Sequence, residues 1–423
     1  MKEKVIGETP RGVTRLTPIA PRLTPIASRL SPHASHLTEL PPLALYVHIP
    51  WCLKKCPYCD FNSHELKDEL PEAAYIDAVL GDLEQALPAV WGRRLASVFI
   101  GGGTPSLFSP AAIERLLSGI RAALPLNPYT EVTLEANPGT FEADKFRVFR
   151  DLGINRLSLG VQSFNPEHLA ALGRVHTSDE AKRAIEFAAK NFDNFNLDLM
   201  YALPRQTLAQ ALADIDTALG YTPPHLSAYH LTLEPNTLFH RYPPPLPDDD
   251  LAADMQEAIE EKLSAAGYGH YETSAFARPG REARHNVNYW EFGDYLGIGA
   301  GAHSKISFPD RIVRELRHKQ PRAYMESVAA GAHIIERHEV DDASRPFEFM
   351  MNALRLTGGF PTALFAERTG LPITAIAREL AVAEERGLLE RDHVTTRPTL
   401  RGQRFLNDLL QIFLEDGAAP RAP

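Results

Sequence analysis

The chain of 423 residues contains little cysteine, and its three thiols, Cys52, Cys56 and Cys59, all fall within one short segment. An odd number of cysteines packed this closely does not form a framework of disulfide bonds. Closely spaced thiols in a loop suit a shared metal centre, and free thiols are typical of a reducing compartment. We therefore expect a cytoplasmic protein whose cysteines are metal ligands.

Long apolar runs and an excess of positive charge are also missing. No segment approaches the roughly 20 apolar residues that a membrane-spanning helix needs, and none has the apolar core of a secretory signal. The 54 acidic residues outnumber the 44 lysines and arginines, which gives a net charge of −10. Because nucleic-acid binding normally requires a basic surface, we expect no nucleic-acid partner.

Acidic residues are absent between Glu8 and Glu39, where a seven-residue pattern repeats. The copies read RLTPIAP, RLTPIAS, RLSPHAS and HLTELPP. Proline in every copy excludes a coiled-coil heptad. A segment that is rich in arginine, serine and threonine and lacks acidic residues is typical of a transit peptide. We prefer to interpret residues 1–42 as a disordered extension outside the fold.

From residue 43 onward, β-rich apolar segments alternate with stretches of helical length. Strands are predicted at 43–48, 95–100, 131–136, 155–161, 194–199 and 225–231, and helices at 70–87, 110–123, 142–152, 178–191 and 207–219. This alternation implies parallel strands joined by right-handed crossovers. We therefore predict an α/β fold whose six units form a partial (β/α)6 barrel, with a doubly wound sheet as the alternative.

The pattern changes again after about residue 335. Helices are predicted at 347–356, 361–369 and 373–385, followed by short strands at 388–391 and 394–396 and a last helix at 400–414. Three helices and a β-hairpin are the order of a winged-helix-like domain. Some such domains bind DNA and others pack against a neighbour, and the acidic composition favours packing. The expected domains are thus 1–42, 43–335 and 336–423.

The segment LYVHIPWCLKKCPYCDFN, residues 45–62, carries the main chemical signal. It follows the first predicted strand, where the active-site loops of α/β barrels emerge. Three thiolates spaced C-x3-C-x2-C can hold three irons of a 4Fe-4S cluster and leave the fourth iron open to a substrate. A structural zinc site completed by His48 or His64 is the alternative, although such sites normally use two close pairs of ligands.

This motif after a first strand resembles the signature of the radical SAM superfamily. Within the superfamily, LYVHIPWC and CPYCDFN closely resemble the heme chaperones, which are related to oxygen-independent coproporphyrinogen III dehydrogenase. The resemblance extends from about residue 43 to the C-terminal region. It implies a radical SAM barrel in which Cys52, Cys56 and Cys59 hold the cluster and S-adenosyl-L-methionine (SAM) binds the open iron.

The resemblance also assigns the SAM pocket. The turn GGGTPS, residues 101–106, matches the segment that holds the methionyl part of SAM, and its missing side chains let the backbone approach a ligand. Carboxylates at strand ends can accept hydrogen bonds from SAM, and arginine can pair with its carboxylate. The matching residues are Tyr46, Tyr58, Gly102, Gly103, Thr104, Glu135, Gln162, Arg174 and Asp198. The coproporphyrinogen relatives are described as holding two SAM molecules, and the last three residues would contact the second.

Two features favour a chaperone over a porphyrin-forming enzyme. The porphyrin-forming relatives carry a further cysteine at the position of Phe61. The run HNVNYW, residues 285–290, is a mark of the heme chaperones and is tied there to heme binding. Imidazole can ligate heme iron, and tyrosine and tryptophan offer flat apolar surfaces, so His285 is the expected heme ligand. Four other histidines are alternatives that we expect to be structural: His48, His176, His230 and His303.

Two further segments bear on the site. The segment YLGIGAGAHS, residues 295–304, is expected to be a glycine-rich loop that lines the same face. In YALPRQ, residues 201–206, the family pattern usually has glycine at the positions of Ala202 and Arg205. This departure concerns the conformation of that loop and leaves the cluster motif unaffected.

By resemblance, the protein is a heme chaperone that passes heme to heme-requiring proteins such as respiratory membrane complexes, with a homodimer as one expected state. A radical SAM fold is equally compatible with an enzyme. The alternatives are therefore an oxygen-independent coproporphyrinogen III oxidase, a radical SAM methyltransferase and a zinc-held interaction module.

Overall fold

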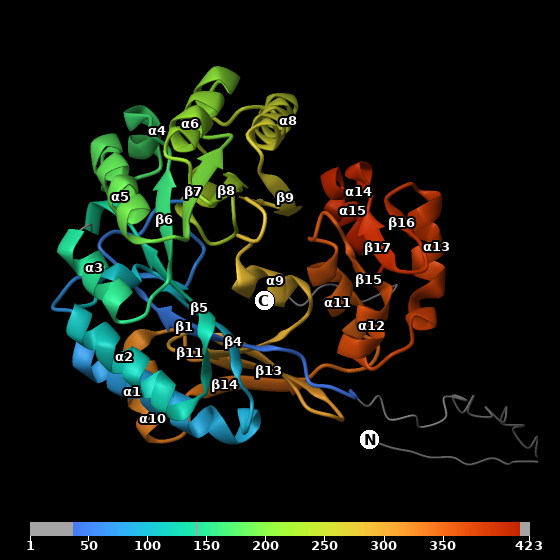
Figure 1. Cartoon of the computed structure of the whole chain (residues 1–423), viewed down its shortest axis with the longest axis horizontal. Coiled ribbons are helices and arrows are strands. Elements are labelled where there is room, and N and C mark those ends of the chain that lie inside the picture. The colour runs from blue at the N-terminus through green and yellow to red at the C-terminus, as the bar shows by residue number, and fades with distance from the viewer. Residues whose placement is uncertain (1–36, 141–142, 415–423) are drawn as a thin grey trace, which may run out of the picture. The chain divides into compact units, whose positions relative to one another are not determined.

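The computed structural model describes residues 37–140 and 143–414. The first three repeats of the predicted N-terminal extension lie outside the described residues, as does the C-terminal segment 415–423; of the fourth repeat, residues 37–42 are described. Within the described part, one sheet contains twelve strands in the order β14-β13-β12-β11-β1-β4-β5-β6-β7-β8-β10-β9. Figure 1 shows helices along the outer side of this sheet.

Consecutive parallel strands form the centre of the sheet. They are β1 (Leu43–Ile49), β4 (Leu95–Gly102), β5 (Leu126–Ala136), β6 (Arg156–Gln162), β7 (Phe195–Tyr201) and β8 (His225–His230). A doubly wound sheet reverses its strand order at a switch point, whereas these strands follow one another in chain order. The predicted barrel units are therefore confirmed, and the doubly wound alternative is wrong.

Antiparallel strands extend the sheet at both edges, which the sequence analysis did not predict. Strand β11 (Asp294–Ile298) lies parallel to β1 and starts the first extension. The strands that follow it are β12 (His303–Ser307), β13 (Ile312–Arg317) and β14 (Ile334–Glu339). At the other edge lie β10 (Ala275–Ala277) and β9 (Gly269–Glu272). Strand β14 runs past residue 335, the expected end of the barrel domain.

A layer of helices covers the outer face of the sheet. Its members are α1 (Glu72–Ala86), α2 (Pro110–Ala123), α3 (Ala143–Asp151), α4 (Pro166–Ala171), α5 (Ser178–Asn191), α6 (Leu208–Gly220), α8 (Asp249–Ala265) and α10 (Pro321–Ala329). Helix α1 contacts α10 and α2, α2 contacts α3, and α3 contacts α5, so the layer is continuous there. Thr177 and Thr207 begin α5 and α6 with capping boxes that satisfy the first amide groups of each helix.

Shorter elements connect these layers and bear much of the site. They are β2 (Trp51–Cys52), β3 (His64–Glu65), η1 (Leu87–Val90), η2 (Pro105–Leu107), η3 (Pro138–Thr140), α7 (Leu238–Arg241) and α9 (Arg284–Trp290). Helix α9 contacts β1, β4 and β11. None of the described helices is long and apolar enough to cross a membrane.

The C-terminal region has the predicted order of helices followed by a hairpin. Its elements are α11 (Arg345–Ala353), β15 (Phe360–Pro361), α12 (Thr362–Thr369), η4 (Ile373–Ile376), α13 (Ala377–Glu385), β16 (Leu389–Arg391), β17 (Thr395–Pro398), α14 (Leu400–Arg404) and α15 (Leu406–Gln411). The predicted last helix is divided at Phe405, because α14 sets Gly402 against the Leu388 carbonyl whereas α15 buries Leu409 in the core of this region. Arg404 also pairs with Glu260 of α8 at 2.8 Å.

The turn after β7 has an unusual backbone at the two positions where the family pattern has glycine. Ala202 and Arg205 adopt left-handed conformations, with φ values of 55° and 59°. Such a conformation costs a residue with a side chain roughly 1–2 kcal/mol. Both residues therefore hold a strained backbone conformation that glycine would adopt without this cost.

Replacing Arg205 by glycine should raise the free energy of unfolding by about 0.5–1 kcal/mol, because the relief of strain exceeds the entropy that glycine loses on folding. Ala202→Gly should have a smaller effect, since its buried methyl group is lost. Urea unfolding monitored by circular dichroism measures both. The control Ala213→Gly, on the exposed face of α6, should lower stability by about 1 kcal/mol. An equal loss for Arg205→Gly would contradict the assignment of strain.

Candidate functional site

The three cysteines lie on the loop that follows β1 and open onto one cavity. Cys52 ends β2, which pairs with β3, and Cys56 and Cys59 follow in the next turn. All three are partly exposed and line a cavity of about 530 Å³. Burial raises the pKa of the Cys52 and Cys59 thiols. Thiolates at these positions therefore require positive charge, which a metal centre supplies.

The arrangement of the thiols bears on the kind of metal centre. Among residues 37–140 and 143–414, no group of three or more His, Cys, Asp or Glu side chains is arranged to hold a single metal ion. Three thiol sulfurs on one loop that faces a cavity are the donor set of a 4Fe-4S cluster, in which each thiolate binds a different iron.

Hydrogen bonds at the end of β1 fix the start and end of the cysteine loop. His48 accepts a hydrogen bond from the Tyr46 hydroxyl at 2.7 Å and donates to the Asn62 carbonyl at 2.9 Å. Burial lowers the pKa of His48 to about 4, so the ring is neutral. The Asn62 side chain donates to the carbonyls of Ala300 and Lys319, each at 2.8 Å. The loop is thus tied to the segment between β11 and β12 through Ala300 and to the end of β13 through Lys319.

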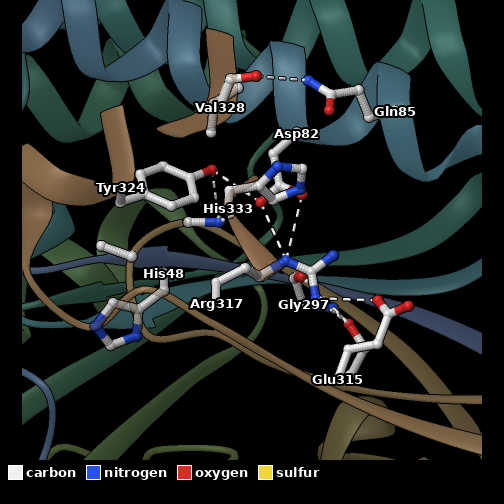
Figure 2. Close-up of polar contacts among 12 residues, drawn as sticks. His48, Asp82, Gln85, Gly297, Glu315, Arg317, Tyr324, Val328 and His333 are labelled. Carbon is white, nitrogen blue, oxygen red and sulfur yellow. Dashed lines mark hydrogen bonds and ion pairs between the residues drawn. The ribbon is translucent and has the colours of Figure 1, made fainter. Parts of the chain in front are cut away.

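A buried ion pair holds that segment in place (Figure 2). Asp82 of α1 accepts hydrogen bonds from Arg317 Nε at 3.1 Å, Tyr324 Oη at 2.8 Å and the Gly299 amide at 3.1 Å. His333 Nε2 contacts the same carboxylate at 3.0 Å. The predicted glycine-rich loop at 295–304 is therefore not a wall of the cavity. It includes the ends of two strands, and its turn supports the cysteine loop from behind.

The glycine turn after β4 packs tightly against the cysteine loop. A Cβ atom on Gly102, whose φ is 110°, would lie 2.4 Å from the His48 ring, and one on Gly103 would lie 2.5 Å from the Trp51 carbonyl oxygen. Only glycine fits such approaches. Both glycines line the cavity, whereas Thr104 is buried behind it and accepts a hydrogen bond from Asn137 at 2.8 Å.

Two carboxylates project into the cavity, Glu135 from the end of β5 and Asp198 from the middle of β7, where the sequence analysis expected a strand end. Glu135 of β5 accepts a hydrogen bond from the Gly102 amide at 2.9 Å, and burial raises its pKa to about 7. Burial also raises the pKa of Asp198 on β7, which accepts hydrogen bonds from Ser158 at 2.9 Å and Asn196 at 2.8 Å. Buried carboxylates of this kind are suited to a cationic or hydroxyl-bearing ligand.

The remaining SAM positions lie around the same cavity. Gln162 ends β6 with a left-handed φ of 68°, a strained conformation of the kind found at functional sites. Arg174 donates to the Gly160 carbonyl at 2.7 Å, and its Nη1 lies 3.6 Å from Cys56 Sγ. Tyr58 packs against Phe239, with ring centroids 6.3 Å apart. All three residues line the cavity, as do Tyr46 and both carboxylates.

Helix α9 brings His285 to the deep part of the cavity. Its Nδ1 lies 3.2 Å from Glu131 Oε1, and burial lowers the pKa of the imidazole, so the neutral ring donates to the carboxylate. The lone pair of Nε2 is then free for a ligand. Tyr289, one turn further along, also lines the cavity. Trp290 does not, because its ring packs under the Arg355 guanidinium at 4.9 Å, so its expected role as a heme surface is wrong.

Sequence reasoning missed the polar floor of the cavity. Every second residue of β6 faces inward, and the inward residues are Arg156, Ser158, Gly160 and Gln162. Asn196 and His225, near the starts of β7 and β8, lie beside them, with His225 Nδ1 2.7 Å from Asn196 Oδ1. The signal was present as alternation in RLSLGVQ, where apolar residues occupy only the outward positions.

Parallel strands in chain order, a glycine turn against a three-cysteine loop and a polar lumen together define a radical SAM protein. Residues 46–218 match the family described as "Radical SAM superfamily", and residues 340–405 match "HemN C-terminal domain". More narrowly, the chain belongs to the heme chaperone HemW family. It is 49% identical to the heme chaperone HemW of Escherichia coli (strain K12) over 90% of this chain and 100% of the relative.

Further comparisons agree with this assignment and confirm the resemblance inferred from the sequence. The chain is 46% identical to HemW of Haemophilus influenzae over 90% of this chain and 100% of that relative. It is 34% identical to HemW of Bacillus subtilis over 88% of this chain and 99% of that relative. The structure of coproporphyrinogen III oxidase (HemN) from Escherichia coli matches with a TM-score of 0.76 at 24% identity. That match covers 90% of this chain and 92% of HemN, and it establishes the shared fold.

Glu135→Gln should remove a pH-dependent loss of stability. The folded protein raises the pKa of Glu135 from 4.5 to about 7, so the native state binds this proton more tightly than the unfolded state. The free energy of unfolding therefore falls as pH rises through this range. The variant should match the wild type near pH 4.5 and exceed it at pH 8 by on the order of 3 kcal/mol.

Urea unfolding at both pH values measures this difference. The control is Glu131→Gln. Although burial raises the pKa of Glu131, the hydrogen bond with His285 holds it below its ordinary value. Glu131→Gln should therefore destabilise the protein at pH 8. A constant difference between wild type and Glu135→Gln across the pH range would contradict the assignment.

Proposed function

We propose that this protein binds heme and passes it to heme-requiring proteins, with a 4Fe-4S cluster and SAM as its cofactors. The observation that carries the proposal is that His285 and the three thiols open onto the same cavity. Membership of the heme chaperone HemW family supports it, as does the HNVNYW run on α9. The relatives of 49% and 46% identity are both named heme chaperones.

In this proposal each part of the chain has a distinct task. Cys52, Cys56 and Cys59 hold the cluster, which when bound supplies an electron and an open iron for SAM. The turn at Gly102 and Gly103 accommodates the methionyl part of SAM, and the carboxylates, Gln162 and Arg174 orient the rest. Glu131 keeps the proton on Nδ1 of His285, so that Nε2 can bind heme iron.

The proposed partners follow from transfer of heme. Recipients are heme-requiring proteins, among them respiratory membrane complexes, and a homodimer is the proposed assembly. Free thiols on the cluster loop favour a cytoplasmic location. Phe61, which takes the place of the further cysteine found in the porphyrin-forming relatives, favours a chaperone over an oxidase.

Changing any one cluster thiol tests the cofactor assignment. Cys52→Ala, Cys56→Ala and Cys59→Ala should each abolish the visible absorbance of the anaerobically reconstituted cluster, because a cubane held by two thiolates is labile. The fold should persist, since the thiols are only partly buried. Far-ultraviolet circular dichroism and iron analysis measure both effects. Phe61→Ala, an exposed neighbour, is the control and should keep the cluster. Full iron content in any one cysteine variant would refute its assignment.

His285→Ala tests the heme site. The variant should bind heme at least about 10-fold more weakly, because an iron ligand is lost, while SAM affinity stays unchanged. Heme titration followed by visible absorbance provides the measurement. His303→Ala, on an exposed residue outside the cavity, should bind heme like the wild type.

The heme titration tests the ligand, and a separate activity assay distinguishes the chaperone from the oxidase. Wild-type heme affinity in His285→Ala would refute this ligand assignment. Conversion of coproporphyrinogen III to protoporphyrinogen by the anaerobic wild-type protein would favour the oxidase reading.

A further inference from the structure

One arginine on the floor of the cavity has no partner. Arg156 begins β6, is 2% exposed and lines the cavity. Its guanidinium makes no hydrogen bond or ion pair with any residue that the structure describes, and its Nε atom is fully buried. Arginine stays charged in proteins and offers five donors in a planar fork. Burying a guanidinium whose donors make no hydrogen bond is unfavourable, and an anion bound in the cavity would supply the missing acceptors.

Other buried arginines of the described chain donate hydrogen bonds to acceptors of the protein itself. Arg317 contacts Asp82 through Nε at 3.1 Å and Ser304 through Nη1 at 2.8 Å. Arg174 donates to the Gly160 carbonyl at 2.7 Å. Arg156 differs from both because its polar end meets the cavity instead of protein acceptors.

The carboxylates near Arg156 already have other partners. Glu131 accepts hydrogen bonds from His285 Nδ1 at 3.2 Å and from the Arg284 amide at 3.0 Å. Asp198 accepts hydrogen bonds from Ser158 and Asn196. Neither carboxylate lies within ion-pair distance of Arg156. The positive charge of Arg156 still acts on these neighbours. Burial and the hydrogen bond between Glu131 and His285 have the larger effects on the pKa values of both groups, and the charge of Arg156 helps to lower both values.

We propose that Arg156 is the receptor for a carboxylate of the ligand that occupies the deep part of the cavity. A guanidinium can bind a carboxylate through two parallel hydrogen bonds, which fixes orientation as well as affinity. The inference rests on the proposed function, which supplies the propionates of heme; the carboxylate of SAM, whose methionyl part is placed at the turn of Gly102 and Gly103, is the competing source that the test separates. It assigns a role to a residue outside the cluster motif, the glycine turn and HNVNYW.

The test compares each ligand with an analogue that lacks the carboxylate. The full-length reconstituted protein is titrated with heme and heme dimethyl ester, and with SAM and decarboxylated SAM. For one of these pairs, the wild type should bind the carboxylate form about 10- to 100-fold more tightly, the size of a charge-assisted hydrogen-bonded pair. In Arg156→Met this preference should vanish, and Arg156→Lys should restore part of it.

Preference in the heme pair identifies a propionate, and preference in the SAM pair identifies the SAM carboxylate. The inference is overturned if the wild type and Arg156→Met prefer the carboxylate form equally in both ligand pairs, or if the wild type shows no such preference in either pair. Both outcomes leave the proposed function standing. Failure of the wild type to bind heme at all contradicts the proposed function itself.

A stability measurement separates a binding role from a structural one. Arg156→Met removes an unpaired buried charge, so the melting temperature of the ligand-free protein should stay the same or rise. Arg317→Met, the matched control, leaves Asp82 buried without its partner and should lower the melting temperature. An equal fall in Arg156→Met would mean that the arginine supports the fold, and would overturn the inference.

Discussion

The buried ion pair between Asp82 and Arg317 fixes the part of the structure on which the site depends. It joins α1 to the end of β13, and both side chains are fully buried. A buried pair is most favourable when its remaining polar atoms are satisfied. Here the Asp82 carboxylate also accepts hydrogen bonds from Tyr324 and the Gly299 amide (Figure 2), whereas Arg317 Nη2 has no partner among the described residues. The antiparallel edge of the sheet thereby becomes a rigid support for the cysteine loop, which must present three thiols in a fixed arrangement.

The two faces of the sheet differ in polarity. Outward residues such as Leu157 and Leu159 pack against helices and are fully buried, as is usual for parallel strands. Inward residues include acids whose pKa burial raises, such as Glu135. These groups reduce the stability of the ligand-free protein and are suited to bind ligands, a trade-off that functional sites commonly make.

The regular elements could be predicted because alternation and helix-length spacing are local signals: helix α5 lies at its predicted residues, 178–191. The antiparallel edges of the sheet could not be predicted in this way. Strand β10 is only three residues long and β14 is mostly exposed, so neither gives a clear apolar pattern. Motif resemblance placed the expected site residues, and the structure brings them around one cavity, with Thr104 just behind it. It could not reveal that Trp290 turns toward Arg355, since that depends on a contact distant in sequence.

The depth of the cavity bears on how its ligands are arranged. Its lining includes both the first residue of β6, Arg156, and the last, Gln162. A strand of seven residues spans roughly 20 Å, so the cavity follows the strand from the cysteine loop to the floor. The active sites of α/β barrels normally lie at the carboxyl ends of the strands, and the thiols obey this rule. His285 and Arg156 lie at the opposite end of the lumen, so a ligand bound there can be held by groups that are separate from those that hold the cluster.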